Sequence, residues 1–259
     1  MSYFTFHLVF ILPPIILLAL LQRSIAGVKA WRVKAALPLI ASIALIYTTP
    51  WDNYLVWRGI WHYGIDRIIG TIGYVPIEEY LFFLLQCLLT GLWLYWLLAH
   101  QPESMQPGLR VERGWLMLIA GVILSFAGVW MLQKDSTLYC GLILTWATPV
   151  LALQWFIGTA TLWTMRRVWL LGVLVPTVYL WITDLVAINS GIWQISQTYT
   201  IGLQFFGLPV EEATFFLVTN LLTVQGILLF LRMKVNLRAD SDSKTAFVDF
   251  DQARVDMKS

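Results

Sequence analysis

Seven long stretches of apolar residues, separated by short polar connections, dominate the pattern of the chain. A helix needs about 20 apolar residues to cross a hydrocarbon layer about 30 Å thick. The pattern therefore predicts seven membrane-spanning helices. We place them at roughly residues 3–21, 35–51, 77–99, 114–132, 138–158, 168–187 and 209–231.

The composition agrees with this pattern, since 59% of the 259 residues are apolar, 12% are charged and the mean hydropathy is +0.72. Soluble domains carry about 25% charged residues, so a globular protein with a water-facing shell is excluded. Residues 1–10 lack the basic region of a cleavable signal peptide, and we expect the first span to be retained. The net charge of +2 does not indicate a nucleic-acid partner. Cys87 and Cys140 lie in apolar runs and are interpreted as inert thiols.

The basic residues are concentrated in alternate connections. Lysine and arginine in short loops mark the cytoplasmic side of a membrane protein. We therefore expect the amino terminus outside, the carboxyl terminus in the cytoplasm, and a disordered cytoplasmic tail over residues 236–259. The basic residues of the richer side are Arg23, Lys29, Arg32, Lys34, Arg110, Arg113, Arg166, Arg167, Arg232, Lys234 and Arg238, against Arg58, Arg67 and Lys134 on the other side.

Two motifs occur twice in the same order. Residues 76–83 read Pro-Ile-Glu-Glu-Tyr-Leu-Phe-Phe and recur at 209–216 as Pro-Val-Glu-Glu-Ala-Thr-Phe-Phe, an offset of 133. Upstream, residues 52–61 and 184–193 both begin with an aspartate and end with Gly-Ile-Trp, an offset of 132. The chain is therefore predicted to contain two related units of three helices each.

We predict a first repeat over residues 1–100, a linker with the fourth helix over 101–135, and a second repeat over 136–235. Each repeat has a connection of about 25 residues between its second and third helices. An even number of crossings separates matching helices, so both glutamate motifs face the same side. The predicted fold is an all-α membrane protein with two parallel three-helix repeats, a class in which sites lie at the repeat interface.

Two adjacent glutamates open the third helix of each repeat. Proline favours the first position of a helix, which places these glutamates in the first turn. A carboxylate there can simply complement the helix dipole, by about 0.3 to 1 kcal/mol. Two such groups side by side, occurring twice near a membrane, favour a functional role instead. Adjacent helical positions point about 100° apart, so one of each pair can face the interior and share a proton. The candidate acid–base residues are Glu78, Glu79, Glu211 and Glu212.

Asp52 and Asp184 are predicted to end the helices that precede the long connections. Each can mark the place where water begins, or its recurrence can indicate a further catalytic group. Trp61 and Trp193 can belong to the aromatic belt of a membrane interface, or can offer their ring faces to a cation. His7 is interpreted as an ordinary interface residue.

Several motifs are missing from the sequence. No span has an interior lysine to form a retinal Schiff base. The chain contains neither a dinucleotide or phosphate-binding glycine loop nor an aspartate-rich Mg²⁺ motif. We therefore expect no cofactor and no metal.

The doubled glutamate motifs at 76–83 and 209–216, together with the Trp-Asp-Asn to Gly-Ile-Trp block at 51–61, resemble the integral-membrane lycopene cyclases of some bacteria, archaea and fungi. In that family each three-helix half can be a separate chain, and this chain looks like the fused form over residues 1 to about 235. Leu185, where the first repeat has Asn53, indicates that the halves differ in role.

The resemblance implies a reaction and a set of residues. It implies proton-initiated cyclisation of the ψ end groups of lycopene to β-ionone rings, giving γ-carotene and then β-carotene without net redox change. The glutamates would supply acid and base, and which one is the acid stays open. The implied partners are lycopene and membrane lipid, with self-association or association with other carotenoid enzymes left open. The residues expected to line the substrate pocket are Trp61, Trp193, Phe82, Phe83, Phe215 and Phe216.

Two other functions fit the same pattern. A small transporter of three-plus-one-plus-three architecture would use the carboxylates to bind protons or a solute, and it would need polar residues along a midplane path. A hydratase of carotenoid ends would admit water to the same cation. The pigments formed from lycopene distinguish the three.

Overall fold

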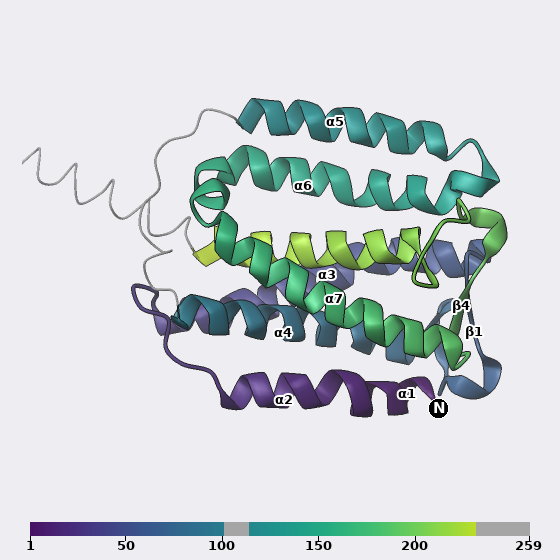
Figure 1. Ribbon diagram of the computed structural model, residues 1–259, viewed down its shortest axis with the longest axis horizontal. Helices are drawn as coiled ribbons and strands as arrows, with labels where there is room; N and C mark the ends of the chain where they lie inside the picture. Colours follow the sequence, from purple (N-terminus) through teal and green to yellow (C-terminus); the bar gives the residue numbers. More distant parts are fainter. Residues whose placement is uncertain (101–113, 232–259) are drawn as a thin grey trace, which may run out of the picture.

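The computed structural model describes residues 1–100 and 114–231. Within these ranges, seven helices are long and apolar enough to cross a membrane, which confirms the predicted all-α membrane fold. They run side by side along the long axis of the molecule (Figure 1). The predicted disordered tail and most of the polar part of the linker lie outside the described residues.

The first span is interrupted by a widened turn. It consists of α1 (Tyr3–Phe6), the π-helical η1 (His7–Ile11) and α2 (Leu12–Leu20). Pro13 and Pro14 follow this turn, and proline can neither donate a backbone hydrogen bond nor tolerate the carbonyl four residues earlier. A π turn just before the prolines relieves that conflict within a continuous span.

The helix α3 (Ala30–Arg58) is longer than predicted, because it continues through Pro38 and Pro50 and ends where Gly59 adopts a positive φ of 75°. The prediction that Asp52 ends this helix is therefore wrong. Asp184 likewise lies inside its helix, α7 (Arg166–Asn189). The predicted span over residues 35–51 stops just before Asp52, but a carboxyl group that faces the bundle interior does not limit a span.

The remaining helices are α4 (Ile77–His100), α5 (Gly114–Met131), α6 (Leu138–Thr164) and the last helix, Val210–Leu231. The helix α4 and the last helix form the centre of the bundle. In their most apolar stretches 67% and 61% of the residues are buried, against 11% in α5. Both central helices begin one residue after the proline of their motif. Their first turns therefore carry the glutamates, as predicted.

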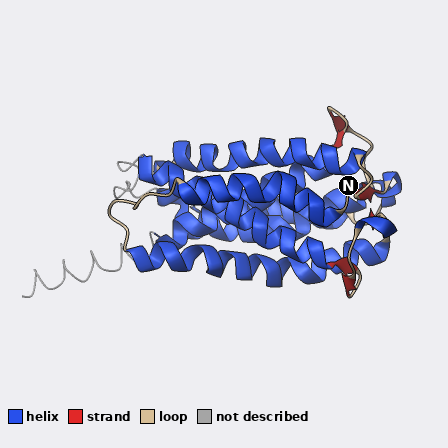
Figure 2. Ribbon diagram, turned by 90° about the horizontal axis from the view of Figure 1, so that it is seen from below, coloured by secondary structure: helices blue, strands red, loops and turns tan. Residues whose placement is uncertain are grey.

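Short strands occupy the connections at one end of the bundle (Figure 2). The strand β1 (Trp61–Tyr63) pairs with β4 (Trp193–Ile195), and two hairpins lead into the central helices: β2 (Thr71–Ile72) with β3 (Val75–Pro76), and β5 (Gln204–Phe205) with β6 (Leu208–Pro209). The 3-10 turns η2 (Ile65–Arg67), η4 (Asp135–Thr137) and η5 (Gln197–Tyr199) lie at this end as well. The connections cover residues 59–76 and 190–209, so they are shorter than predicted.

The pairing of β1 with β4 joins matching segments of the two predicted repeats. The strands are antiparallel, and His62 lies opposite Gln194, its counterpart at an offset of 132. Two copies of one segment that pair antiparallel at matching residues are related by a local twofold axis. This arrangement is expected for like-oriented repeats, whose exact boundaries stay a prediction.

The helix α5 packs on α6 through small residues. A Cβ atom at Gly121 would overlap Ala152, and one at Gly128 would lie 2.9 Å from the Cβ of Leu144. Small residues allow such close helix contacts in membranes, where dispersion and not the hydrophobic effect drives helix association.

We expect Gly121→Leu to lower the heat stability of the detergent-solubilised protein, because overpacking a close contact costs about 1 to 3 kcal/mol. Ala120→Leu is the control, since the neighbouring Ala120 is exposed on the same helix. The measurement is the midpoint of thermal unfolding. Equal midpoints for the two variants would contradict the close packing of α5 on α6.

Candidate active site

The two glutamates of each motif point in different directions. Glu78 accepts a hydrogen bond at Oε1 from the backbone N–H of Ile69, at 2.7 Å. Glu211 accepts the matching bond from Ile201, at 2.6 Å. Each carboxyl group thus ties the preceding connection to the start of a central helix. We expect these two candidate acid–base residues to have a positioning role instead.

The second glutamate of each motif faces the space between the repeats. Glu79 accepts at Oε2 from the phenols of Tyr3, at 2.6 Å, and Tyr63, at 3.0 Å. Glu212 accepts at Oε1 from the phenol of Tyr139, at 2.6 Å, and from Trp61 Nε1, at 3.1 Å. Each carboxyl group is therefore held by a pair of donors at a single oxygen.

The three tyrosines were missed by the sequence analysis. Tyr3 opens the first helix, and Tyr139 lies in the first turn of α6, the first helix of the second predicted repeat. Their separation is 136, close to the offsets of the motifs. Extending the repeat comparison to the first helices would therefore have identified this pair. Tyr63 has Ile195 as its counterpart, so the repeat carries no signal for it.

Tyr63 keeps its proton in this setting. Burial raises the pKa of the Tyr63 phenol well above 10.0, and the nearby Glu79 and Asp52 raise it further. The phenol therefore acts as a hydrogen-bond donor to Glu79.

Asp52 and Asp184 are both buried, with exposures of 0% and 1%, so the interpretation that they mark the start of water is wrong. Asp184 Oδ1 accepts a hydrogen bond from Trp193 Nε1, at 2.8 Å. The two carboxyl oxygens of Asp52 find no hydrogen-bond partner within the described ranges. The matching tryptophan, Trp61, donates instead across the repeat interface to Glu212. The site is therefore not symmetric.

Glu79, Glu212 and Asp184 line a small cavity of about 20 Å³, and Asp52 is not among its lining residues. Trp61 and Trp193 are 7% and 8% exposed and line it, so they are not belt residues at a membrane interface. Five of the six aromatic residues expected in the pocket line this cavity, whereas Phe83 lines a different one. The lining residues of the small cavity are Tyr3, Trp61, Tyr63, Glu79, Phe82, Asp184, Trp193, Glu212, Phe215 and Phe216.

His7 also lies beside the site, which corrects its interpretation as an interface residue. Its side chain is 1% exposed, and its ring lies 4.8 Å from that of Tyr3 and stacks on Phe82 at 6.0 Å between centroids. Neither ring nitrogen has a hydrogen-bond partner among residues 1–100 and 114–231. The counterpart of His7 at an offset of 136 is Ile143, a further difference between the halves.

The cavity combines acids with aromatic walls and carries no basic side chain among its described lining residues. The described residues also contain no group of three or more His, Cys, Asp and Glu side chains placed to hold a metal ion. Fold and site together define an integral membrane protein in which one carboxyl group from each glutamate motif lines a common aromatic cavity.

Comparison with known proteins identifies the family. The chain is 43% identical over 230 residues to proteins named lycopene beta-cyclase from two strains of Halobacterium salinarum, covering 88% of this chain and 95% of each relative. The chain belongs to the lycopene cyclase family. This confirms the resemblance seen in the doubled motifs, and the protein is an enzyme.

Fungal proteins named bifunctional lycopene cyclase/phytoene synthase are also similar. The protein of Phaeosphaeria nodorum is 34% identical over 249 residues and that of Leptosphaeria maculans 37% over 244, each covering 88% of this chain and 41% of the relative. No family model matches the chain, and no solved structure matches it.

We expect Glu78→Leu to destabilise the protein, because the backbone N–H of Ile69 then loses its buried acceptor, at a cost of roughly 1 to 3 kcal/mol. Glu78→Gln is the matched control, since its amide oxygen can still accept the bond. The midpoint of thermal unfolding in detergent measures the effect. A leucine variant as stable as the glutamine variant would contradict the positioning role of Glu78.

Proposed function

We propose that this protein closes the acyclic ψ end groups of lycopene to β-ionone rings, with Glu79 and Glu212 as its acid and base. One observation carries the proposal. Matching carboxyl groups from the two glutamate motifs converge on one small, aromatic-lined cavity. The family membership supports the same substrate, since the curated relatives are named for lycopene.

The reaction needs one proton delivered and one removed. A neutral carboxyl group protonates the terminal double bond, which leaves a tertiary carbocation. The neighbouring double bond attacks this cation, and a new carbon–carbon bond closes the ring. A carboxylate then removes a ring proton to form the ring double bond. Atoms and electrons balance, so the product is an isomer of the substrate and the enzyme regains its proton.

The hydrogen bonds of the two glutamates suit this exchange. The described donors all reach a single oxygen of each group, Oε2 of Glu79 and Oε1 of Glu212. The second oxygen of each carboxyl group is left for the substrate. The phenols hold both groups in place, which supplies the fixed geometry that proton transfer requires.

The walls of the cavity suit the cation. Water would trap a carbocation as an alcohol, so the site must exclude it. Ring faces stabilise a desolvated cation by about 2 kcal/mol, and the cavity has such faces in Trp61, Trp193 and Phe215. We assign Asp184, whose carboxyl group lines the cavity, to the negative charge that stabilises the cation. Asp184 positions Trp193.

The transporter alternative is disfavoured by the polar residues at mid-depth. Gln86 donates to Thr219 at 2.7 Å, and Thr90 donates to Asn220 at 2.7 Å. Asn220 in turn donates to Thr177 at 2.9 Å. These side chains satisfy one another and join helices, so they do not present a row of free polar groups to a solute.

The proposed orientation places the carboxyl cavity near the outer face of the membrane. Arg23 and Lys29 lie in the connection between α2 and α3, and Arg166 and Arg167 begin α7, at the end of the bundle opposite to β1 and β4 (Figure 1). Positive residues favour the cytoplasmic side. The amino terminus, which lies at the end of β1 and β4, would then be outside.

We expect Glu79→Gln and Glu212→Gln each to reduce ring formation about 100-fold or more, because general acid–base catalysis contributes roughly 10²- to 10⁴-fold. The measurement is chromatography of pigments from a lycopene-accumulating bacterium that expresses each variant, with protein levels checked by immunoblot. Glu78→Gln and Glu211→Gln are the matched controls and should keep most of the activity.

Three outcomes would contradict the proposal in different ways. Wild-type levels of β-carotene in both Glu79→Gln and Glu212→Gln would remove these residues as acid and base. Hydroxylated products from the wild type would indicate the hydratase. Unchanged lycopene in the presence of the folded wild-type protein would exclude both activities.

We expect Tyr3→Phe and Tyr139→Phe to lower the rate about tenfold or more, because a hydrogen bond to a charged group contributes roughly 1.5 to 3 kcal/mol. Tyr74→Phe is the control, since this tyrosine is 57% exposed at a hairpin tip. Initial rates in lipid vesicles loaded with lycopene provide the measurement. Full rates in both phenylalanine variants would show that the phenols do not position the acids.

A further inference from the structure

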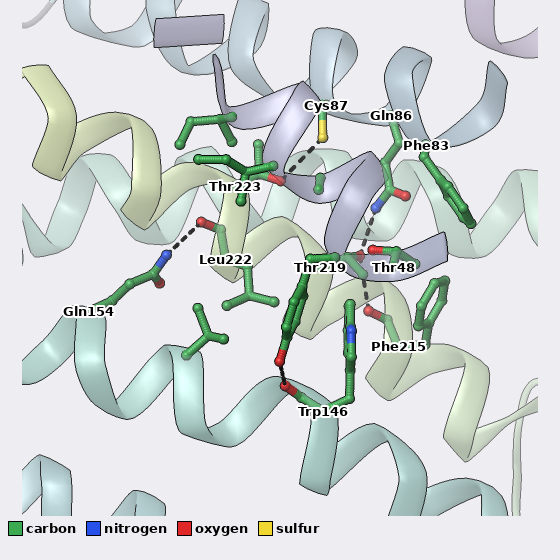
Figure 3. A pocket seen from close by; sticks show the side chains of 15 residues that line it. Thr48, Phe83, Gln86, Cys87, Trp146, Gln154, Phe215, Thr219, Leu222 and Thr223 are labelled. Atoms are coloured by element: carbon green, nitrogen blue, oxygen red, sulfur yellow. Dashed lines mark hydrogen bonds between the residues drawn. The ribbon is translucent and has the colours of Figure 1, made fainter. Parts of the chain in front are cut away.

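A second cavity, of about 100 Å³, lies beside the carboxyl cavity, and we call it the lateral groove. Its floor is formed by α4 and the last helix, and its walls by α3 and α6 (Figure 3). Six residues define it for the argument: Ala44, Tyr47, Trp146, Val150, Phe215 and Thr219.

The lateral groove opens at the side of the bundle. Ile43 and Tyr47 contribute to its lining and are 53% and 42% exposed. Both lie near the middle of α3, far from the ends of the span. The mouth of the groove therefore faces the hydrocarbon layer and not water.

A run of aromatic rings joins the lateral groove to Glu212. Phe215 lines both cavities. Trp51 stacks on Trp146 at 4.8 Å and on Phe215 at 5.6 Å between centroids. Trp61 meets Phe215 edge-on at 5.5 Å and donates to Glu212. One end of a molecule bound in the groove would thus lie beside Phe215, which also lines the cavity that contains Glu212.

The polar groups of the groove are mostly paired with one another. Gln86 donates to Thr219, and the Sγ of Cys87 lies 3.7 Å from the Oγ1 of Thr223. The Tyr47 phenol donates to the carbonyl of Trp146 at 2.8 Å (Figure 3). Trp146 Nε1 has no partner in the described chain, and an N–H of this kind donates weakly to a π system. The groove therefore suits a conjugated hydrocarbon.

The second repeat reproduces this aromatic run except at Trp51. The counterpart of Trp51 at an offset of 132 is Thr183, and that of Thr48 is Leu180. The counterpart of Trp146 at an offset of 136 is Phe10. Trp51, which stacks on both Trp146 and Phe215, is thus the ring of this run that occurs on the side of Glu212 alone.

We propose that the lateral groove holds the polyene chain next to the reacting end group, and that the substrate enters sideways between α3 and α6 towards Glu212. This rests on the proposed cyclase activity. The lateral groove can admit only one end of a symmetric polyene at a time. The monocyclic product must therefore leave and return by its other end before the second ring forms.

The test uses substitutions by phenylalanine that fill the groove from its α3 wall or from its α6 wall. Ala44→Phe adds bulk from α3, and Val150→Phe adds bulk from α6. Ser42→Phe is the matched control, because Ser42 lies on the exposed face of α3 and does not line the groove. Each variant is purified into lipid nanodiscs, and its initial rate with lycopene and the order of appearance of mono- and bicyclic product are measured. Lycopene retention after washing is measured in the same variants on a Glu212→Gln background.

We expect both groove variants to lower the initial rate and the retained lycopene at least tenfold, with Ser42→Phe unchanged and the monocyclic product appearing first in the wild type. Rates and retention equal to those of Ser42→Phe in either folded groove variant, shown by an unchanged unfolding midpoint, would overturn the proposal. Bicyclic product without a free monocyclic intermediate would overturn entry one end at a time. A wild type that forms no ring would instead refute the proposed function.

Discussion

The bonds between phenol and carboxyl groups at the starts of the two central helices are the interactions on which the site depends. A carboxyl group buried without partners costs several kcal/mol, and a membrane interior offers little water to compensate. Tyr3 supplies the hydrogen bond for Glu79, and Tyr139 supplies it for Glu212. Both tyrosines lie on the first helix of a repeat, so the first and third helices of each repeat can only pack in the position that brings donor and acceptor together.

Matching residues of the two predicted repeats form the site, and differences between the repeats make its two acids unequal. The pairing of β1 with β4 brings the tryptophans of both repeats to the same cavity. Trp193 then binds the aspartate of its own repeat, whereas Trp61 reaches across to Glu212 and leaves Asp52 without a partner in the described structure. Two acids with different neighbours can hold different charges, which is what a reaction with one proton donor and one proton acceptor requires.

The apolar surface of the bundle has two uses. Most of it faces the hydrocarbon layer, as the low burial of α5 shows. At the lateral groove, between α3 and α6, the same kind of surface turns inward and meets the aromatic rings beside the acids. A substrate that is dissolved in the bilayer meets an apolar environment both in the lipid and in this groove. Its entry therefore requires no charged residues at the mouth of the groove.

Hydropathy and the doubled motifs determined the seven spans, the like orientation of the glutamate motifs and the four candidate glutamates, because transfer free energy and repeat spacing are properties of the chain itself. The predicted end of α3 was wrong, since a charge in the sequence does not reveal whether it faces lipid or the bundle. Only the tertiary structure decided that Glu79 and Glu212 face the cavity while Glu78 and Glu211 bind the connections. That choice depends on the rotation of each central helix, which is set by packing against partners far away in the chain, such as Tyr3, 76 positions before Glu79.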